Sequence, residues 1–186
     1  MMGYKYFATG FCVVALFALT LVAARSSQAA SAAELNRDAK AALQKLYAKS
    51  PSAKSLGEKA AAILVFPSIT KGGFIVGGQF GEGALMEGGQ TTGYYSTVSV
   101  SYGLQAGVQK YGYAMFFMTD SALEHLNKSD GWELGTGPSI VIVDVGAAGG
   151  ISTTTAKSDV YAFFFDQKGL MAGLGLQGTK ITKINK

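Results

Sequence analysis

The stretch that decides the fold is Ala61-Ala62-Ile63-Leu64-Val65-Phe66-Pro67, because the sequence changes there from a helical to a strand-like pattern. The branched and aromatic run Ile63–Phe66, stopped by Pro67, predicts a short buried strand rather than a helix. Residues 72–86 follow as apolar segments interrupted by glycines, and Glu87-Gly88-Gly89-Gln90 has the composition of a tight turn. The sequence therefore predicts that a sheet begins at residue 62 and continues into a hairpin.

The chain after this hairpin predicts more strands and one internal helix. Residues 95–102 alternate as a half-buried strand requires, with Val98 and Val100 on the face opposite to Tyr95. Residues 119–127 predict a short helix with a polar cap. Further strands are predicted at residues 112–118, 139–145, 150–155, 160–165, 170–176 and 179–184. Residues 166–169, Asp-Gln-Lys-Gly, have the composition of a hairpin turn.

Two helices are predicted before the sheet. Ser31 and Glu34 have the spacing of a capping box, so a helix should begin there and continue to about Lys49. Pro51 ends this helix, and Ser52 is expected to cap a second, shorter one that reaches about Lys59. In the first helix, apolar residues form one stripe and basic residues occupy the other faces, which is the pattern of an amphipathic basic helix. The stripe consists of Leu35, Ala39, Ala42, Leu43 and Leu46, and the basic residues are Arg37, Lys40, Lys45 and Lys49.

Residues 1–29 are expected to be a secretory signal peptide. The segment begins with Lys5, continues as an apolar stretch over residues 7–24, and ends in the small-residue motif Ser27-Gln28-Ala29. Cleavage near Ala29 predicts an exported protein, periplasmic or peripheral to the cell envelope. The alternative is an uncleaved anchor, because about eighteen apolar residues just reach the length of a membrane span.

The composition predicts one folded domain over residues 30–186, with a helical part at 30–60 and a β-rich core at 61–186. The chain has 186 residues, 48% of them hydrophobic and 15% charged, which is typical of a single domain with a sizeable core. Two basic residues, Lys5 and Arg25, lie in the signal segment, so fourteen basic and twelve acidic residues remain. Nucleic-acid binding is therefore not expected, since such proteins carry a dense basic stripe.

Catalysis and cofactors are not expected either. The single cysteine, Cys12, lies in the signal segment, so the predicted domain has neither a thiolate metal site nor a cysteine nucleophile. His125 is the one histidine, and the polar residues of its predicted helix are too local to form a nucleophile pocket with it. Residues 173–178 satisfy GxGxxG, but no helix can follow them to receive a dinucleotide phosphate.

The predicted fold class is α+β: a predominantly antiparallel β-sheet, barrel- or sandwich-like, with N-terminal helices and one short internal helix. An outer-membrane barrel is the alternative for an exported, glycine- and tyrosine-rich chain of strands. The two leading helices, the central helix and the absence of an aromatic-terminated final strand favour a soluble β-rich domain with peripheral helices.

Three blocks of the sequence resemble one known family. They are Ala61–Pro67, then Lys71-Gly72-Gly73-Phe74-Ile75-Val76-Gly77-Gly78, and Lys168-Gly169-Leu170-Met171-Ala172-Gly173-Leu174-Gly175-Leu176-Gln177-Gly178. In this order they resemble the SYLF domain of eukaryotic actin-patch and phosphoinositide-binding proteins and of exported bacterial relatives. The resemblance extends over about residues 35–184, and the last block is its most specific part.

The resemblance implies a non-catalytic domain that binds an anionic phospholipid membrane surface. The candidate lipid-binding residues are Arg37, Lys40, Lys45, Lys49, Lys54, Lys59, Lys71, Lys168, Lys180 and Lys183. Actin binding belongs to the eukaryotic members and is not expected of an exported protein, and no protein partner is indicated. The residues agree with this, because a basic amphipathic helix can bury its apolar stripe at a membrane interface. Two alternatives stay open: the stripe could cover the β-core, and the protein could be a structural or partner-binding envelope protein without lipid affinity.

Overall fold

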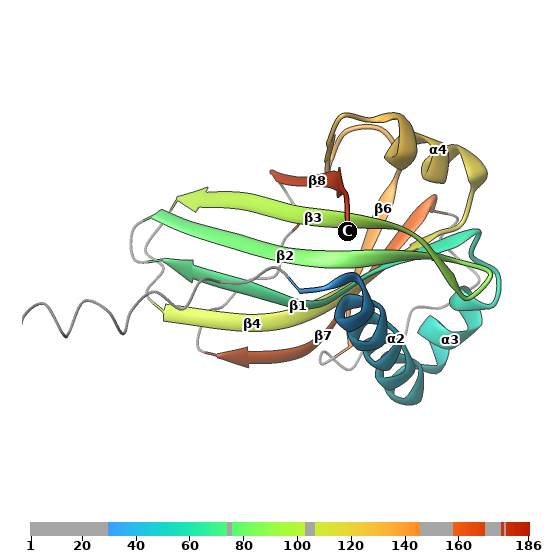
Figure 1. Cartoon of the computed structure of the whole chain (residues 1–186), viewed down its shortest axis with the longest axis horizontal. Helices are drawn as coiled ribbons and strands as arrows, with labels where there is room; N and C mark the ends of the chain where they lie inside the picture. The colour runs from blue at the N-terminus through green and yellow to red at the C-terminus, as the bar shows by residue number, and fades with distance from the viewer. Residues whose placement is uncertain (1–29, 74–75, 103–106, 146–157, 170–175, 177) are drawn as a thin grey trace, which may run out of the picture. The chain divides into compact units, whose positions relative to one another are not determined.

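One curled eight-stranded sheet forms the centre of the computed structural model, which describes residues 30–73, 76–102, 107–145, 158–169, 176 and 178–186 (Figure 1). The strands are β1 (Ala62–Gly73), β2 (Val76–Glu87), β3 (Gln90–Tyr102), β4 (Gly107–Phe117), β5 (Trp132–Glu133), β6 (Ile140–Asp144), β7 (Val160–Gly169) and β8 (Thr179–Ile184). Their order is β5-β8-β3-β2-β1-β4-β7-β6, and every pairing is antiparallel except that of β6 with β7. The predicted α+β class is confirmed, in its barrel-like rather than its sandwich-like form.

Two units are distinguished, Met1–Ala30 and Ser31–Lys186, and the sheet belongs to the second. Its helices are α2 (Ala32–Lys49), α3 (Pro51–Gly57) and α4 (Asp120–Lys128). The capping box at the start of α2 is confirmed, since Ser31 and Glu34 each bond to the other's backbone N–H. The predicted cap of α3 is wrong by two residues: Ser50 rather than Ser52 accepts the hydrogen bond of Ala53. None of the described helices is both long and apolar enough to cross a membrane.

The inner face of the sheet carries the main hydrophobic core. Tyr113 of β4 packs between Phe66 of β1 and Phe164 of β7, with ring centroids 4.7 Å and 5.4 Å apart. At the other end of this face Phe117 packs on Trp132, 6.0 Å away. Helix α4 adds Ala122 and Leu126 to the same cluster, so it covers the inner face.

The outer face of the sheet is covered at one end by α2, which packs against β1 and β2. Tyr47 of α2 lies 6.4 Å from Phe116 of β4, which in turn packs edge-on against Phe163 of β7 at 5.2 Å. The apolar stripe of α2 is turned toward this layer, and Leu35, Ala39, Ala42 and Leu46 are buried. The alternative in which the stripe covers the β-core is therefore confirmed.

β1 continues through the proline that was expected to end it. Pairing shifts on both sides of the strand, between Val65 and Ser68 toward β2 and between Phe66 and Ile69 toward β4. Pro67 lies in this bulge, where its missing N–H removes no regular ladder bond. The predicted end at Pro67 is thus wrong, because a bulge accommodates the proline and the strand resumes to Gly73.

The tight turn between β2 and β3 is confirmed. Glu87 pairs with Gln90, and the two residues between them, Gly88 and Gly89, have φ of 55° and 80°. Two consecutive positive φ angles match the right-handed twist of a two-residue hairpin and favour glycine. The predicted strands at 150–155 and 170–176 lie outside the described residues, apart from Leu176.

Candidate functional site

The end of α2 is tied to β7 by an ion pair. Nζ of Lys49 lies 2.6 Å from Oδ1 of Asp166, and both side chains are partly open to solvent, at 55% and 36% of their full exposure. Lys49 is the last residue of α2, so the pair links the end of the helix to the sheet.

A bulge in β7 sets the position of Asp166. Phe165 pairs with Gly112 of β4 and Lys168 pairs with Lys110, so two residues of β7 face one residue of β4. Asp166 has φ of 52°, the left-handed conformation that aspartate tolerates better than most residues. The predicted hairpin turn at 166–169 is therefore wrong: these residues form the bulged end of a strand, and the same polar composition serves both structures.

Three lysines act on the Asp166 carboxylate. Its pKa is lowered chiefly by the hydrogen bond from Lys49, which outweighs the opposing effect of desolvation. The charges of Lys49, Lys45 and Lys168 lower the pKa further. We call Lys45, Lys49 and Lys168 the basic cluster. Because one carboxylate faces three ammonium groups, the cluster keeps an excess of positive charge.

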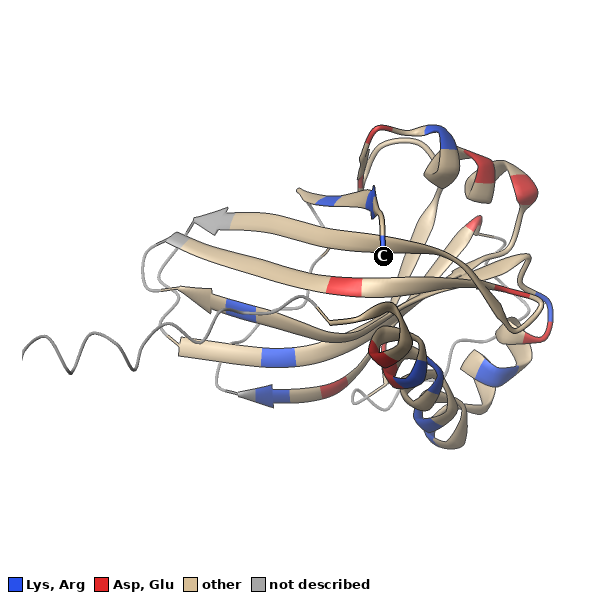
Figure 2. Ribbon diagram, viewed as in Figure 1, with Lys and Arg blue, Asp and Glu red and all other residues tan. Residues whose placement is uncertain are grey.

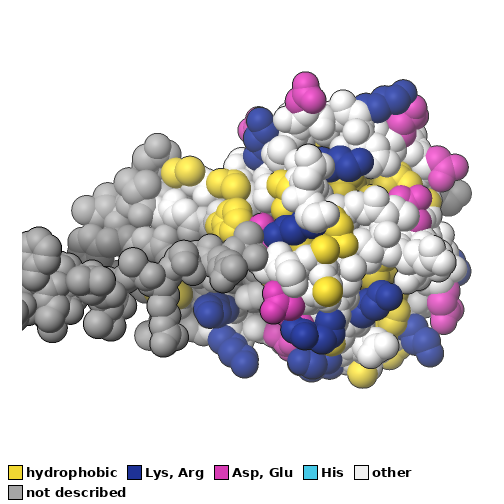
Figure 3. Space-filling model, in the orientation of Figure 1, with side chains coloured by type: hydrophobic (Ala, Val, Ile, Leu, Met, Phe, Trp, Pro, Cys, Tyr) yellow, Lys and Arg dark blue, Asp and Glu magenta, His cyan; other side chains and the backbone are white. Residues whose placement is uncertain are grey.

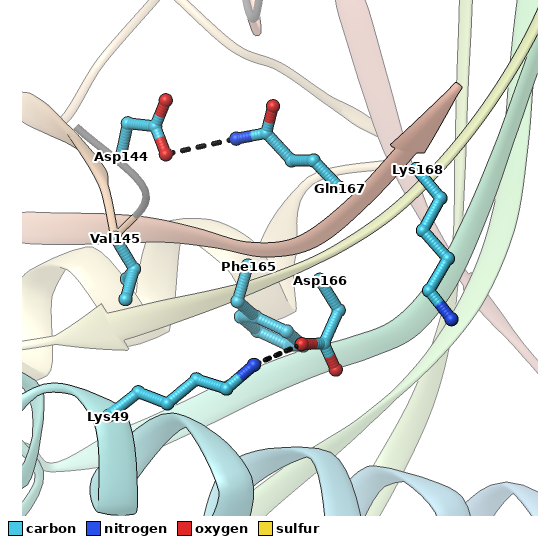
Figure 4. A pocket seen from close by; sticks show the side chains of 7 residues that line it. All are labelled: Lys49, Asp144, Val145, Phe165, Asp166, Gln167 and Lys168. Carbon is cyan, nitrogen blue, oxygen red and sulfur yellow. Dashed lines mark hydrogen bonds and ion pairs between the residues drawn. The ribbon is translucent and has the colours of Figure 1, made fainter.

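A surface pocket of about 600 Å³ lies beside this cluster (Figure 4). Its lining residues are Lys49, Asp144, Val145, Phe165, Asp166, Gln167 and Lys168. Gln167 turns away from Asp166 and donates to Asp144 at 2.9 Å, so the bulge sends its two polar side chains to different partners. The pocket lining thus holds two ammonium groups, an amide and two carboxylates, so its formal charges balance. The excess of positive charge lies in the basic cluster, which also includes Lys45.

The other basic residues predicted on the helices are all exposed. Arg37 is paired with Asp38 at 3.0 Å, and Lys40 lies on the same helix. Lys54 lies in α3, and Lys59 lies just after it. The structure leaves these side chains on the surface, and Figure 2 shows basic residues along α2 and α3.

The predicted lysines of the sheet are divided between its two faces. Lys71 pairs with Gln79 and with Gln109, whose side chains are buried, so it lies on the inner face. Lys168 and Lys180 lie on the outer face, whereas Lys183 lies opposite the buried Tyr95 and so belongs to the inner one. The ten predicted residues therefore do not form one surface; the structure brings Lys45, Lys49 and Lys168 together.

Two members of the site were missed by sequence reasoning. Asp166 was interpreted as a turn residue, and Lys110 was not considered, although it lies directly opposite Lys168. No sequence pattern marks either residue as part of a binding site. Asp166 is recognised from its ion pair with Lys49, and Lys110 from the pairing of β4 with β7.

The inner face holds a buried polar chain with a structural role. Tyr111 donates to Gln79 at 2.5 Å, and Gln79 donates to Thr179 of β8 at 3.1 Å. Burial raises the pKa of Tyr111 to about 12. These bonds join β4, β2 and β8 across the sheet.

No group of three or more histidine, cysteine or acidic side chains suited to a metal ion occurs within the described ranges. His125 packs edge-on against Trp132, with ring centroids 5.7 Å apart. This contact gives the histidine a packing role beside the core.

The family model for Ysc84, described as Las17-binding protein actin regulator, matches residues 98–186. The matched region runs from within β3 to the end of β8, and it includes Lys110, Asp166 and Lys168. A comparison with curated proteins found no match to the chain.

Proposed function

We propose that the chain is a non-catalytic lipid-binding domain that acts at the surface of a bacterial envelope membrane. The proposal is supported by the match of residues 98–186 to the model of the Ysc84 family, whose domain is the SYLF domain. The family description names Las17 binding and actin regulation. We do not extend these activities to this chain, because its first 29 residues have the anatomy of an export signal. The proposed location is the periplasm or the membrane periphery.

The observation that carries the proposal is the basic cluster. Lys45 and Lys49 come from α2 and Lys168 from β7, and all three are exposed around one carboxylate. A lysine near an anionic lipid surface contributes about 1 kcal/mol to the free energy of binding. Several lysines at one site therefore favour binding to an anionic membrane. The phosphate groups of anionic phospholipids are the chemistry that this cluster fits.

Vesicle flotation of residues 31–186 tests the proposal. This fragment is a compact unit with its own core, and it omits the apolar N-terminal segment that would bind lipid by itself. We expect flotation with vesicles of phosphatidylcholine containing phosphatidylglycerol, and much less with phosphatidylcholine alone. Binding should weaken as salt rises, because charges are screened within about 8 Å at physiological ionic strength.

Charge reversal of the helix tests whether its basic residues carry the binding: the variant should float much less with anionic vesicles than the parent protein, and equal flotation would show that they do not. Replacing Lys40, Lys45 and Lys49 by Glu changes the net charge by six units and leaves the buried stripe intact. Circular dichroism verifies that the variant is folded. If the parent protein does not float with anionic vesicles even at low salt, the proposal is wrong and a structural or partner-binding envelope protein becomes the better explanation.

A further inference from the structure

A row of paired residues crosses six strands on the outer face, beyond the part that α2 covers. Each residue is directly opposite the next, so all of them share one face of the sheet. In the order β8, β3, β2, β1, β4 and β7 the row is Lys180, Val98, Phe80, Thr70, Lys110 and Lys168. Its centre is apolar and each end carries lysine.

A second row lies two residues further along the strands. It consists of Val100, Gly78, Gly72 and Val108. A Cβ atom added at Gly72 or Gly78 would meet no atom closer than 3.8 Å, so the space above these glycines is open. The two valines thus lie on either side of two glycines that carry no side chain.

The apolar side chains of both rows are open to solvent. Exposed fractions are 52% for Phe80, 45% for Val98, 58% for Val100 and 62% for Val108. We call these four residues the β-face patch. Figure 3 shows hydrophobic side chains in this region at the left of the folded unit. Contiguous exposed apolar side chains with a polar rim are typical of interaction surfaces.

The charges beside the β-face patch are mainly positive. Lys110 and Lys168 are neighbours on β4 and β7, and Lys168 also belongs to the basic cluster. On the opposite side Lys180 is accompanied by Glu133, its partner on β5. The nearest acidic residue of β2, Glu82, is ion-paired with Lys186 at 2.7 Å. The patch is therefore continuous with positive charge on its β4–β7 side, and Figure 2 shows basic residues on both strands there.

Helix α2 cannot provide the apolar part of a membrane contact while it is docked. Leu35, Ala39 and Leu46 are at most 3% exposed, because the sheet already covers them. Insertion of this stripe into lipid would first remove it from the core, which costs free energy in proportion to the apolar area uncovered. The β-face patch needs no such rearrangement.

We propose that the β-face patch is the surface that enters the interface of an anionic bilayer, with Phe80, Val98, Val100 and Val108 among the headgroups and upper acyl chains. Lys110 and the basic cluster, which includes Lys168, contact the lipid phosphates beside the patch. This inference rests on the proposed lipid-binding function and assigns the apolar part of the contact to the sheet. Membrane contacts of this kind combine buried apolar area with attraction to anionic lipid.

Single-cysteine labelling tests the assignment directly. Residues 31–186 contain no cysteine, so Val100→Cys, Val108→Cys and Ile142→Cys each place one environment-sensitive fluorophore. Ile142 is the matched control: it is 47% exposed, and it shares the face of Ile140, which packs on the inner core. We expect a blue shift and quenching by brominated lipid at positions 100 and 108 with anionic vesicles, and neither effect at 142.

A double substitution gives the second measurement. Val100→Ser with Val108→Ser should reduce partitioning into anionic vesicles about tenfold, because each change removes exposed apolar carbon, whereas Ile142→Ser should leave partitioning unchanged. Both positions are exposed, so the fold should be retained.

The outcomes separate this inference from the proposed function. If the parent floats with anionic vesicles but the probes at 100 and 108 stay in water, the patch assignment is wrong and lipid binding stands. If the parent does not float, both are wrong. If residues 31–186 dimerise, and the double serine variant abolishes dimerisation without changing flotation, the patch is an interface between copies and the assignment is again wrong.

Discussion

Lys49 and Asp166 are separated by 117 positions in the sequence, yet Nζ of the first donates to Oδ1 of the second at 2.6 Å. One residue ends a helix and the other occupies a bulge in left-handed conformation, so the contact exists only when both elements are formed. Its main electrostatic effect is to neutralise one positive charge in the basic cluster. That effect gives the first prediction.

Replacing Asp166 by Asn should strengthen binding to anionic vesicles. Asn tolerates the left-handed conformation and has nearly the same shape, but it no longer neutralises Lys49. One additional uncompensated lysine near the membrane contributes about 1 kcal/mol, which corresponds to about fivefold tighter binding. Co-sedimentation at low salt measures the change. An exposed ion pair of this kind contributes little to stability, so the melting temperature should change little.

Asp130→Asn is the matched control for this variant. It makes the same change in net charge, at an exposed position just after α4, the helix that covers the inner face. If Asp130→Asn strengthens vesicle binding as much as Asp166→Asn does, then overall charge rather than the basic cluster governs the affinity.

Lys168→Gln should weaken vesicle binding about fivefold, because one lysine at a membrane surface contributes about 1 kcal/mol. Lys128→Gln serves as the comparison, since Lys128 lies on α4 and is paired with Glu124. We expect the Lys128 variant to bind like the parent protein. Flotation across a salt series checks both, and equal losses for the two variants would contradict the placement of the site.

Gly83→Ala should destabilise the fold by about 1–3 kcal/mol through overpacking. A Cβ atom at Gly83 would lie 2.7 Å from the carbonyl oxygen of Val65 and 2.7 Å from the ring of Phe66, and the backbone atom has little room to move. Gly78→Ala in the same strand has its nearest neighbour at 3.8 Å and should be nearly neutral. Urea unfolding of both variants measures the free energy of unfolding. Equal values for the two variants would show that β1 and β2 accommodate the methyl group at position 83 without strain.

Alkaline pH should reduce stability between about pH 10 and 12. An unfolded tyrosine ionises near pH 10, whereas burial raises the pKa of Tyr111 to about 12. Over this interval the unfolded chain loses a proton that the folded chain keeps, so the free energy of unfolding falls as pH rises. Burial also raises the pKa of Tyr113, which strengthens the trend.

Spectrophotometric titration at the tyrosinate absorbance band checks this prediction. Tyr111→Phe should remove a late-ionising group and make the fall in stability shallower. At neutral pH the same variant leaves Gln79 without its donor, at a cost of about 1–3 kcal/mol. If its titration curve near pH 12 matches that of the parent, Tyr111 is not the late-ionising group.

The sequence correctly predicted those features whose hydrogen bonds or backbone angles involve residues close together in the chain. The capping box of Ser31 and Glu34 and the Gly88-Gly89 turn are each satisfied within a few residues, and both are confirmed. Pro67 was misread because a proline inside a strand depends on bulged pairing with both neighbours, which the strand's own sequence does not encode. The parallel pairing of β6 with β7 also depends on the whole topology.

The candidate site could be predicted only in part, because local patterns identify surface residues but not the distant elements that they contact. The amphipathic pattern of α2 identified Lys45 and Lys49 as surface residues, but it could not decide whether the sheet or a membrane covers the apolar stripe. The strand alternation of residues 95–102 placed Val98 and Val100 on one face, and only the structure shows that this apolar face is the exposed one. Tyr95 and Thr97 occupy the buried face, where each has a polar partner, Asn127 and Tyr113 respectively.

The position of β8 has a consequence for the order of folding. Strands β1 to β4 pair with one another within residues 62–117, but β8 pairs with β3, so Tyr94 meets Ile184 across most of the domain. Contacts between distant segments form slowly, because the chain must close a long loop before they stabilise anything. Until residues 179–184 arrive, β3 presents unpaired backbone groups along one side, which is the kind of edge that recruits strands from other molecules. The newly made chain is therefore most prone to pairing with strands of other molecules before residues 179–184 are added.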